Sequence, residues 1–188
     1  MQEMAVSKKL NGVDVDRLFE TIDAIKQTSG LADFKFRLRN RWINGGLNRS
    51  TIKNFYGAGK DNQRQEPFIL DADEPPVLLG QDTAPNPVEF LLHALVACVT
   101  TSVVYHAAAK GIKLEEVETR VQGDIDLHGF LGLDENVRRG YKNIQIKFRI
   151  KADVPDEQLE EICQLGPTYS PVFDSITRGV NVEVGLER

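Results

Sequence analysis

A run of twenty residues without a charged side chain constrains the fold of this chain most. Residues 90–109 read FLLHALVACVTTSVVYHAAA and contain no Asp, Glu, Lys or Arg. About twenty apolar residues are enough for a helix to cross a bilayer. Polar residues in the middle of the run, two histidines and the lack of a second such run argue against a membrane span. We therefore expect a buried helix over residues 88–110 that ends at Gly111, since a helix that is apolar all round can form the core of a globular protein.

Alternation of apolar and polar residues on both sides of this helix predicts antiparallel strands that are covered on one face. We expect strands over residues 33–43, 47–57, 66–70, 116–128, 142–151 and 180–184, with loops over 58–65, 71–87 and 129–140. We expect further helices over residues 15–27, from Pro155 to Leu165 with a break at Gly166-Pro167, and from Pro171 with Ser170 as its N-cap. This order predicts an α+β fold, in which an antiparallel sheet packs on one long central helix that carries Cys98.

Size and composition predict one main domain in a reducing compartment. The 188 residues fit roughly one domain, so we expect a helical extension over residues 1–30 and a single domain over 31–188. Two cysteines are too few for a disulfide scaffold, and the N-terminus has no apolar run of signal-peptide length, so a cytoplasmic location is expected. One sheet gives an apolar helix too little cover, which favours a homodimer that buries two such helices against each other.

Charge and ligand spacing argue against nucleic-acid, membrane and metal partners. The net charge is −5, although residues 31–64 hold eight Lys and Arg against two acids and residues 65–90 hold six acids and no Lys or Arg. We interpret these segments as two solvated faces rather than a nucleic-acid site, because aromatic residues do not interleave convincingly with the basic ones. His93 and His106 do not share a helix face, so neither a metal nor a cofactor is expected.

Cys98, in the middle of the apolar run, is the main candidate for chemistry. A thiol reacts as thiolate, which nearby cations favour and apolar surroundings disfavour. Its helical neighbours carry no charge, so two interpretations stay open: a small core residue, or a reactive thiolate whose cation comes from another element. Glu89 either stabilises the first turn of the helix or approaches the thiol if the helix starts later than residue 89 or the loop folds back. Cys163, on a second amphipathic helix, is either a packing residue or a partner for Cys98.

The segment Asn86-Pro87-Val88-Glu89, followed by FLLHALVAC, resembles the OsmC/Ohr superfamily, in which such a loop leads into a central helix that carries a cysteine. The resemblance extends to DADEPPVLLGQDTAPNP before the helix, the KGI turn after it and SPVFDSITRGVNVEV at the C-terminus. It covers about residues 33–186 and implies an intertwined α+β homodimer.

The best-known members of that superfamily are cysteine peroxidases that act against oxidative stress, an activity like that of peroxiredoxins. The resemblance implies that Cys98 attacks an organic hydroperoxide and becomes a sulfenic acid, while an Arg–Glu pair orients the thiolate. Where the organic-hydroperoxide-resistance branch has its arginine, this chain has Leu47, so Arg49 is the nearest candidate, with Glu89 as its carboxylate.

The position of the superfamily's second cysteine differs in this chain. It holds Ser170 here, or Pro171 if the match is shifted by one residue, so the chain resembles a divergent branch, and Cys163 is the candidate resolving residue. An external dithiol would then reduce the oxidised enzyme. The missing second cysteine also favours an alternative, a non-catalytic protein of the same fold that binds a small apolar ligand at the dimer interface.

Overall fold

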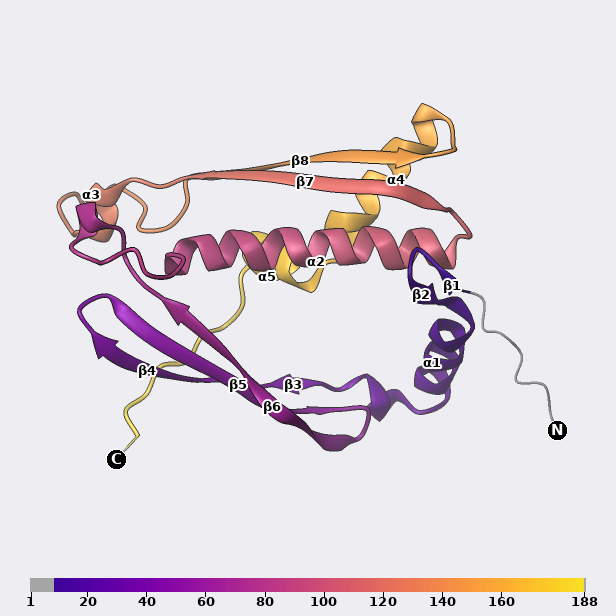
Figure 1. Cartoon of the computed structure of the whole chain (residues 1–188), viewed down its shortest axis with the longest axis horizontal. Coiled ribbons are helices and arrows are strands. Elements are labelled where there is room, and N and C mark those ends of the chain that lie inside the picture. Colours follow the sequence, from indigo (N-terminus) through magenta and orange to yellow (C-terminus); the bar gives the residue numbers. More distant parts are fainter. Residues whose placement is uncertain (1–8, 188) are drawn as a thin grey trace. The chain divides into compact units, whose positions relative to one another are not determined.

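The structure is a computed structural model that describes residues 9–187. Residues 1–8, part of the expected N-terminal extension, and residue 188 lie outside the described residues. The described chain forms two compact units, one of residues 14–91 and one of residues 9–13 and 92–187 (Figure 1). Helices and antiparallel sheets occur side by side, so the predicted α+β class is confirmed.

The first unit begins with helix α1 (Val15–Gln27), as predicted. The side chain of Asp14 caps it by accepting a hydrogen bond from the Arg17 backbone N–H at 3.1 Å. A short 3₁₀ turn, η1 (Ser29–Ala32), follows and leads into the sheet.

The sheet of the first unit is built around β5 (Leu47–Gly57). The short β3 (Lys35–Phe36) and β4 (Arg39–Asn44) pair with one edge of β5, and β6 (Lys60–Ala72) pairs with the other. The predicted strand over 33–43 is therefore divided into two. The predicted loop over 58–65 is wrong, because Ala58 and Gly59 both adopt positive φ angles (53° and 76°) and make a tight hairpin turn.

The long helix α2 (Pro87–Ala109) starts in the first unit and continues into the second. It ends as predicted, with Gly111 in the left-handed conformation at φ 76°. Among the described residues, α2 is the one helix long and apolar enough to cross a membrane, a property that core helices of soluble proteins share.

In the second unit, α2 runs along a hairpin of β7 (Leu114–Asp124) and β8 (Asn143–Ala152) (Figure 1). Between these strands lies the short helix α3 (Leu127–Phe130), where the sequence predicted the end of a strand. The small hairpin of β1 (Lys9–Leu10) and β2 (Val13–Asp14) is tied to the start of β7, because the Asn11 side chain hydrogen-bonds the backbone of Ile112 and Leu114 at 2.9 and 2.8 Å.

Helix α4 (Asp156–Tyr169) packs across α2 and is followed by α5 (Pro171–Arg178). The core here consists of Val103, Ala107, Ile112 and Ile162. Gly166 lets the helices approach closely, since a Cβ atom there would lie 3.1 Å from the backbone oxygen of Val99. The predicted break at Gly166-Pro167 is wrong: α4 continues through both residues to Tyr169, and Pro167 gives up the one helical hydrogen bond that its N–H would donate.

The predicted C-terminal strand over 180–184 is not formed in this chain. Its three valines, Val180, Val182 and Val184, are exposed. A strand needs a neighbour for its backbone hydrogen bonds, and no strand of the described residues pairs with this segment.

Candidate functional site

Cys98 lies in the middle of α2 and is half-buried. The most buried side of the helix in this region carries Leu95, Val99, Ser102 and Val103. The Ser102 hydroxyl donates a hydrogen bond to the backbone oxygen of Cys98 at 3.0 Å. Thr100 shares a hydrogen bond of 2.8 Å with Thr119 on β7. Two of the polar residues that interrupt the apolar run, Thr100 and Ser102, are thus hydrogen-bonded within the unit, and Ser102 is bonded directly to the Cys98 backbone.

The start of α2 is fixed by a capping box. The Asn86 side-chain oxygen accepts from the Val88 N–H, and the Glu89 carboxylate accepts from the Asn86 N–H, both at 2.9 Å. The Asn86 amide also donates to the carboxylate of Glu74. Glu89 therefore serves the first turn, and because α2 begins at Pro87, the condition for Glu89 to fold back toward Cys98 of its own helix is not met.

The loop before α2 is ordered by one buried carboxylate that the sequence analysis did not single out. Asp73 is 2% exposed. Its oxygens accept hydrogen bonds from the backbone N–H groups of Glu74, Gln81 and Thr83 and from the Thr83 hydroxyl, at 2.8 to 3.3 Å. These donors, chiefly the Thr83 N–H, hold the pKa of the Asp73 carboxyl below its ordinary value. No local spacing signals such a residue, since its partners lie up to ten positions away.

Arg49 on β5 is held by a carboxylate on the neighbouring strand. Its Nε and Nη2 donate to the two oxygens of Asp71 at 2.7 and 2.8 Å, in the side-by-side geometry of a bidentate pair. The hydrogen bond to Asp71 raises the pKa of Arg49, and the same bond lowers the pKa of Asp71. The sequence suggested Glu89 as the carboxylate for Arg49, whereas in this chain that partner is Asp71.

The face of the sheet to which Arg49 belongs follows from the strand register. Ser50 and Ile52 on β5 line a pocket of about 270 Å³ together with Pro87 and Phe90 from the start of α2. Side chains alternate between the two faces of a strand. Arg49 therefore lies on the opposite face of the sheet from the start of α2 in the same chain.

Cys163 lies on α4, in the second unit like Cys98, and both cysteines are free. Burial raises the pKa of the Cys163 thiol above its ordinary value. The residue borders an apolar pocket of about 330 Å³, whose walls include Val99, Phe148 and Phe173. Val99 is the next residue after Cys98, so α4 brings Cys163 to the neighbourhood of the Cys98 turn.

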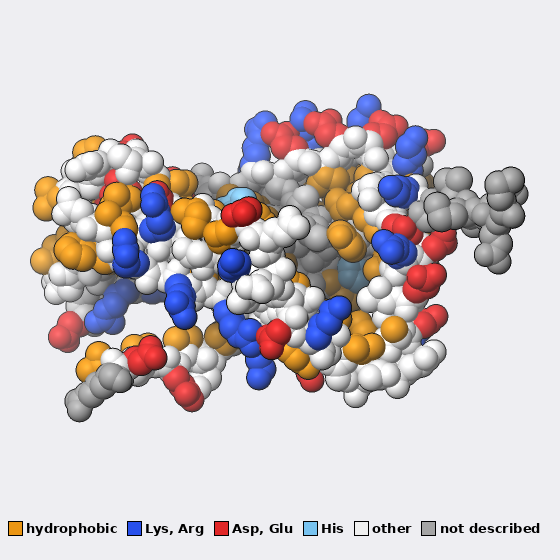
Figure 2. Space-filling model, turned by 60° about the horizontal axis from the view of Figure 1, so that its bottom comes forward, with side chains coloured by type: hydrophobic (Ala, Val, Ile, Leu, Met, Phe, Trp, Pro, Cys, Tyr) orange, Lys and Arg blue, Asp and Glu red, His pale blue; other side chains and the backbone are white. Residues whose placement is uncertain are grey.

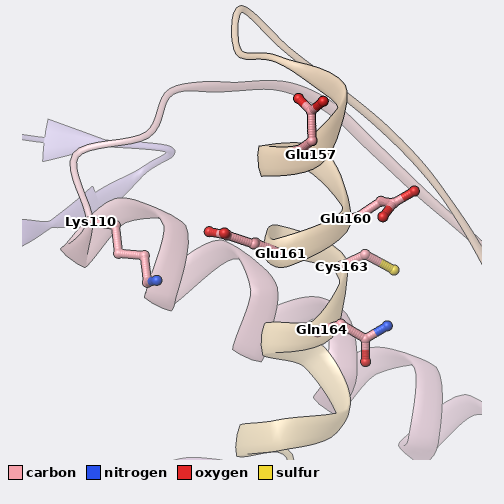
Figure 3. Close-up of a pocket in the computed structure, with 6 residues that line it drawn as sticks. All are labelled: Lys110, Glu157, Glu160, Glu161, Cys163 and Gln164. Atoms are coloured by element: carbon pink, nitrogen blue, oxygen red, sulfur yellow. The ribbon is translucent and has the colours of Figure 1, made fainter.

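A second, polar hollow of about 570 Å³ borders α4 near the end of α2. In Figure 3, Glu161 points toward Lys110, whereas the sulfur of Cys163 lies on the other side of the helix, beside Glu160 and Gln164. The thiol therefore faces away from the lysine.

Ser170, at the position where the superfamily has its second cysteine, caps α5 as predicted. It is 2% exposed, and its hydroxyl accepts a hydrogen bond from the Phe173 N–H at 3.1 Å. The residue thus has a structural role here, and a hydroxyl cannot form a disulfide with a sulfenic acid.

The two histidines of α2 take no part in a metal cluster among the described residues. His106 stacks on Tyr169 with ring centroids 3.8 Å apart. Burial, with a smaller contribution from Lys110, lowers the pKa of His106.

Comparison with known proteins identifies the fold. A family model described as OsmC-like protein matches residues 80–185, more than half of the chain. Among solved structures, an OsmC-like protein from Mycoplasma pneumoniae has a TM-score of 0.56 at 17% identity, over 78% of this chain and 89% of that one. An OsmC-like protein of unknown function from Vibrio cholerae has a TM-score of 0.58 at 10% identity, over 76% and 94%.

A third similar structure is that of an organic hydroperoxide resistance protein from Legionella pneumophila. It has a TM-score of 0.53 at 15% identity, over 79% of this chain and 93% of that one. At these identities the structures show the fold alone. No curated protein matches the sequence.

Proposed function

Because this chain belongs to the OsmC-like family, we propose that it is a cytoplasmic, thiol-dependent peroxidase that reduces organic hydroperoxides as a homodimer. The observation that carries the proposal is that the family match spans Cys98, in the middle of a capped, unbroken helix. In this proposal, residues 31–188 form the catalytic domain and residues 1–30 an extension of it.

The Cys98 thiolate acts as nucleophile. It attacks one oxygen of the hydroperoxide and the O–O bond breaks, which gives a cysteine sulfenic acid and an alkoxide that takes up a proton to leave as the alcohol. Two electrons pass from sulfur to the peroxide. The apolar surface of α2 around Cys98 suits the organic part of such a substrate.

The thiolate needs a cation, and Arg49 is the candidate. Asp71 holds its Nε and Nη2, so its Nη1 still has donors to offer to a sulfur. Arg49 lies on the sheet face opposite the start of its own α2, so we propose that it acts on Cys98 of the twin subunit, together with Glu89. The exposed valines of residues 180–184 and the incomplete burial of α2 support this dimeric arrangement.

The cycle closes by one of two routes. Cys163 can condense with the sulfenic acid to a disulfide, which releases water, and an external dithiol then reduces the disulfide. Since burial raises the pKa of Cys163, its thiolate is scarce at neutral pH. We therefore propose that an external dithiol attacks the Cys98 sulfenic acid directly when Cys163 is too slow.

Peroxide consumption by two single variants tests this proposal. With cumene hydroperoxide and dithiothreitol, Cys98→Ser is expected to lose turnover, whereas Cys163→Ser keeps most of it. Cys163→Ser is the matched control, because it makes the same atomic change on the neighbouring helix. Turnover that survives Cys98→Ser, or an inactive wild-type protein that is dimeric and folded, would contradict the proposal.

A second candidate function rests on the apolar pocket beside Val99 and Cys163. Its volume of about 330 Å³ is within the range of small-ligand sites, so a non-catalytic protein that holds an apolar ligand is the alternative. In that case a hydrophobic fluorescent probe binds to the wild-type protein and is displaced by the ligand, and neither cysteine reacts with stoichiometric hydroperoxide.

A further inference from the structure

The face of the first unit's sheet that lies toward the start of α2 contains the pocket of about 270 Å³. The strand register assigns to this face every second residue of β5 and residues paired with them, which are Asn48, Ser50 and Ile52 on β5, Leu70 and Ala72 on β6, and Asn40 and Trp42 on β4. Pro87 and Phe90 at the start of α2 close the pocket. All of these residues belong to the first unit, so the pocket is separate from the one beside Cys163 in the second unit.

The walls of this pocket are apolar. They consist mainly of the side chains of Leu38, Ile52, Leu70, Ala72, Pro87 and Phe90. None of the described residues that line the pocket is charged. Arg41 and Arg49 lie on the opposite face of the same strands, because they occupy the alternate positions; Figure 2 shows blue Lys and Arg side chains gathered in the lower centre of the view, over this sheet. Since burial of an unpaired charge is costly, the pocket favours an uncharged occupant.

Polar side chains meet at one end of the pocket. The side-chain amide of Asn40 donates to Asn48 Oδ1 at 2.7 Å and to Ser50 Oγ at 3.0 Å. Asn48 in turn donates to the backbone oxygen of Gly46 at 3.3 Å. These bonds use both amide hydrogens of Asn40 and one of Asn48. The hydroxyl hydrogen of Ser50 and the second amide hydrogen of Asn48 remain as donors, and both side chains line the pocket.

Two donors at the end of an uncharged, apolar pocket match a carbonyl oxygen. A carbonyl oxygen accepts hydrogen bonds through two lone pairs and donates none. An ammonium group only donates, and a carboxylate would have to leave water with its charge unpaired. The volume lies just below the range of sites for drug-sized ligands, so the occupant is a small molecule.

We propose that this pocket binds a small neutral carbonyl compound, such as a ketone or an ester. The carbonyl oxygen accepts hydrogen bonds from Asn48 and Ser50, and the apolar body of the ligand lies between the sheet and Phe90. This proposal does not depend on the peroxidase activity, because it uses neither cysteine. It also differs from the second candidate function, which concerns the pocket of the second unit.

The fluorescence of Trp42 tests the proposal. Trp42 is the single tryptophan of the chain and lies across from Asn48 on the face of the pocket, with its indole N–H bonded to the Gly45 backbone oxygen at 3.0 Å. Titration with methyl hexyl ketone at neutral pH should change its emission saturably, with half-saturation at roughly 1 mM or below. Octanoate, which has the same number of carbon atoms, should bind about tenfold more weakly or not at all, because its carboxylate is charged. Isothermal titration calorimetry measures the same affinities without the indole.

Two neighbouring residues of β5 supply a matched pair of variants. Ser50→Ala removes one donor and should weaken the binding of methyl hexyl ketone about fivefold, as expected for one neutral hydrogen bond. Thr51→Val removes the hydroxyl of the next residue, which lies on the opposite face, and should leave the affinity unaltered. Cys98→Ser should bind like the wild-type protein, so a failure of the peroxidase and a failure of this site are distinguishable.

Three results would overturn the proposal. The first is the absence of saturable binding by both fluorescence and calorimetry, as when another part of the protein fills the pocket in solution. The second is octanoate that binds as tightly as the ketone, which would mean adsorption of alkyl chains without recognition of the oxygen. The third is a Ser50→Ala variant that binds the ketone as tightly as Thr51→Val does.

Discussion

The core of the second unit gives a prediction whose size can be worked out from the structure. Ile162 is 1% exposed and packs with Val103, Ala107 and Ile112, directly before Cys163 on α4. Ile162→Ala removes three carbon groups, which costs about 2.4 kcal/mol at about 0.8 kcal/mol each. The cavity left behind brings the expected loss in free energy of unfolding to about 3–4 kcal/mol. Ile162→Val removes one carbon and is expected to cost about 1 kcal/mol.

Urea unfolding at one fixed chain concentration measures these losses, since the stability of an oligomer depends on concentration. Leu133→Ala is the control, because Leu133 is 68% exposed and its truncation should change stability by less than about 0.5 kcal/mol. If Ile162→Ala costs less than about 1 kcal/mol, or no more than Leu133→Ala, then α4 does not pack on α2 in the way described, and the position of Cys163 near Val99 has no support.

Three further predictions concern the helix start, the second thiol and the loop before α2. Asn86→Ala removes the side-chain acceptor for the Val88 N–H and should lower stability by about 1 kcal/mol in urea unfolding, whereas Asn86→Asp should retain most of it. Because burial raises the pKa of Cys163 above 9.0, the alkylation rate of Cys98→Ser by iodoacetamide should still be rising above pH 9.0; a plateau below that pH would contradict the raised pKa. The pKa of Asp73 is lowered from 3.8 by its hydrogen bonds, so the stability it contributes is complete above pH 3.8 and is lost as the pH falls through the lowered value. Thermal melting midpoints should therefore show a smaller acid-dependent loss in Asp73→Asn than in the wild-type protein, and equal losses in both would refute this role.

The long helix was predictable because two local signals agree. The uncharged run has helical length, and Asn86, Pro87 and Glu89 stand at the spacing of a helix start, which the capping box confirms. Other local signals also held. Alternation predicted β5 and β8, an apolar stripe at helical spacing predicted α1, and Ser170 was expected as the cap of α5.

The features that could not be predicted depend on an unusual backbone conformation at a turn or on residues far apart in the sequence. Two consecutive positive φ angles at Ala58 and Gly59 turn an expected loop into a hairpin. Asp73 organises a loop through partners up to ten residues away. The candidate site also contains residues that local sequence signals identify and residues that only strand pairing brings together. The sequence singled out Cys98 and Cys163, but the Arg49–Asp71 pair required the register of β5 and β6.

The reaction of Cys98 with one equivalent of cumene hydroperoxide is the most direct test of the central claim. Mass spectrometry of the Cys163→Ser variant, trapped with dimedone at about pH 7, measures the rate at which the sulfenic acid forms. The account predicts that Cys98 is oxidised much faster than a free cysteine under the same conditions, and that Arg49→Ala slows the reaction toward the free-cysteine rate. A Cys98 that reacts no faster than free cysteine in the folded protein would contradict the claim that this thiol is activated for peroxide reduction.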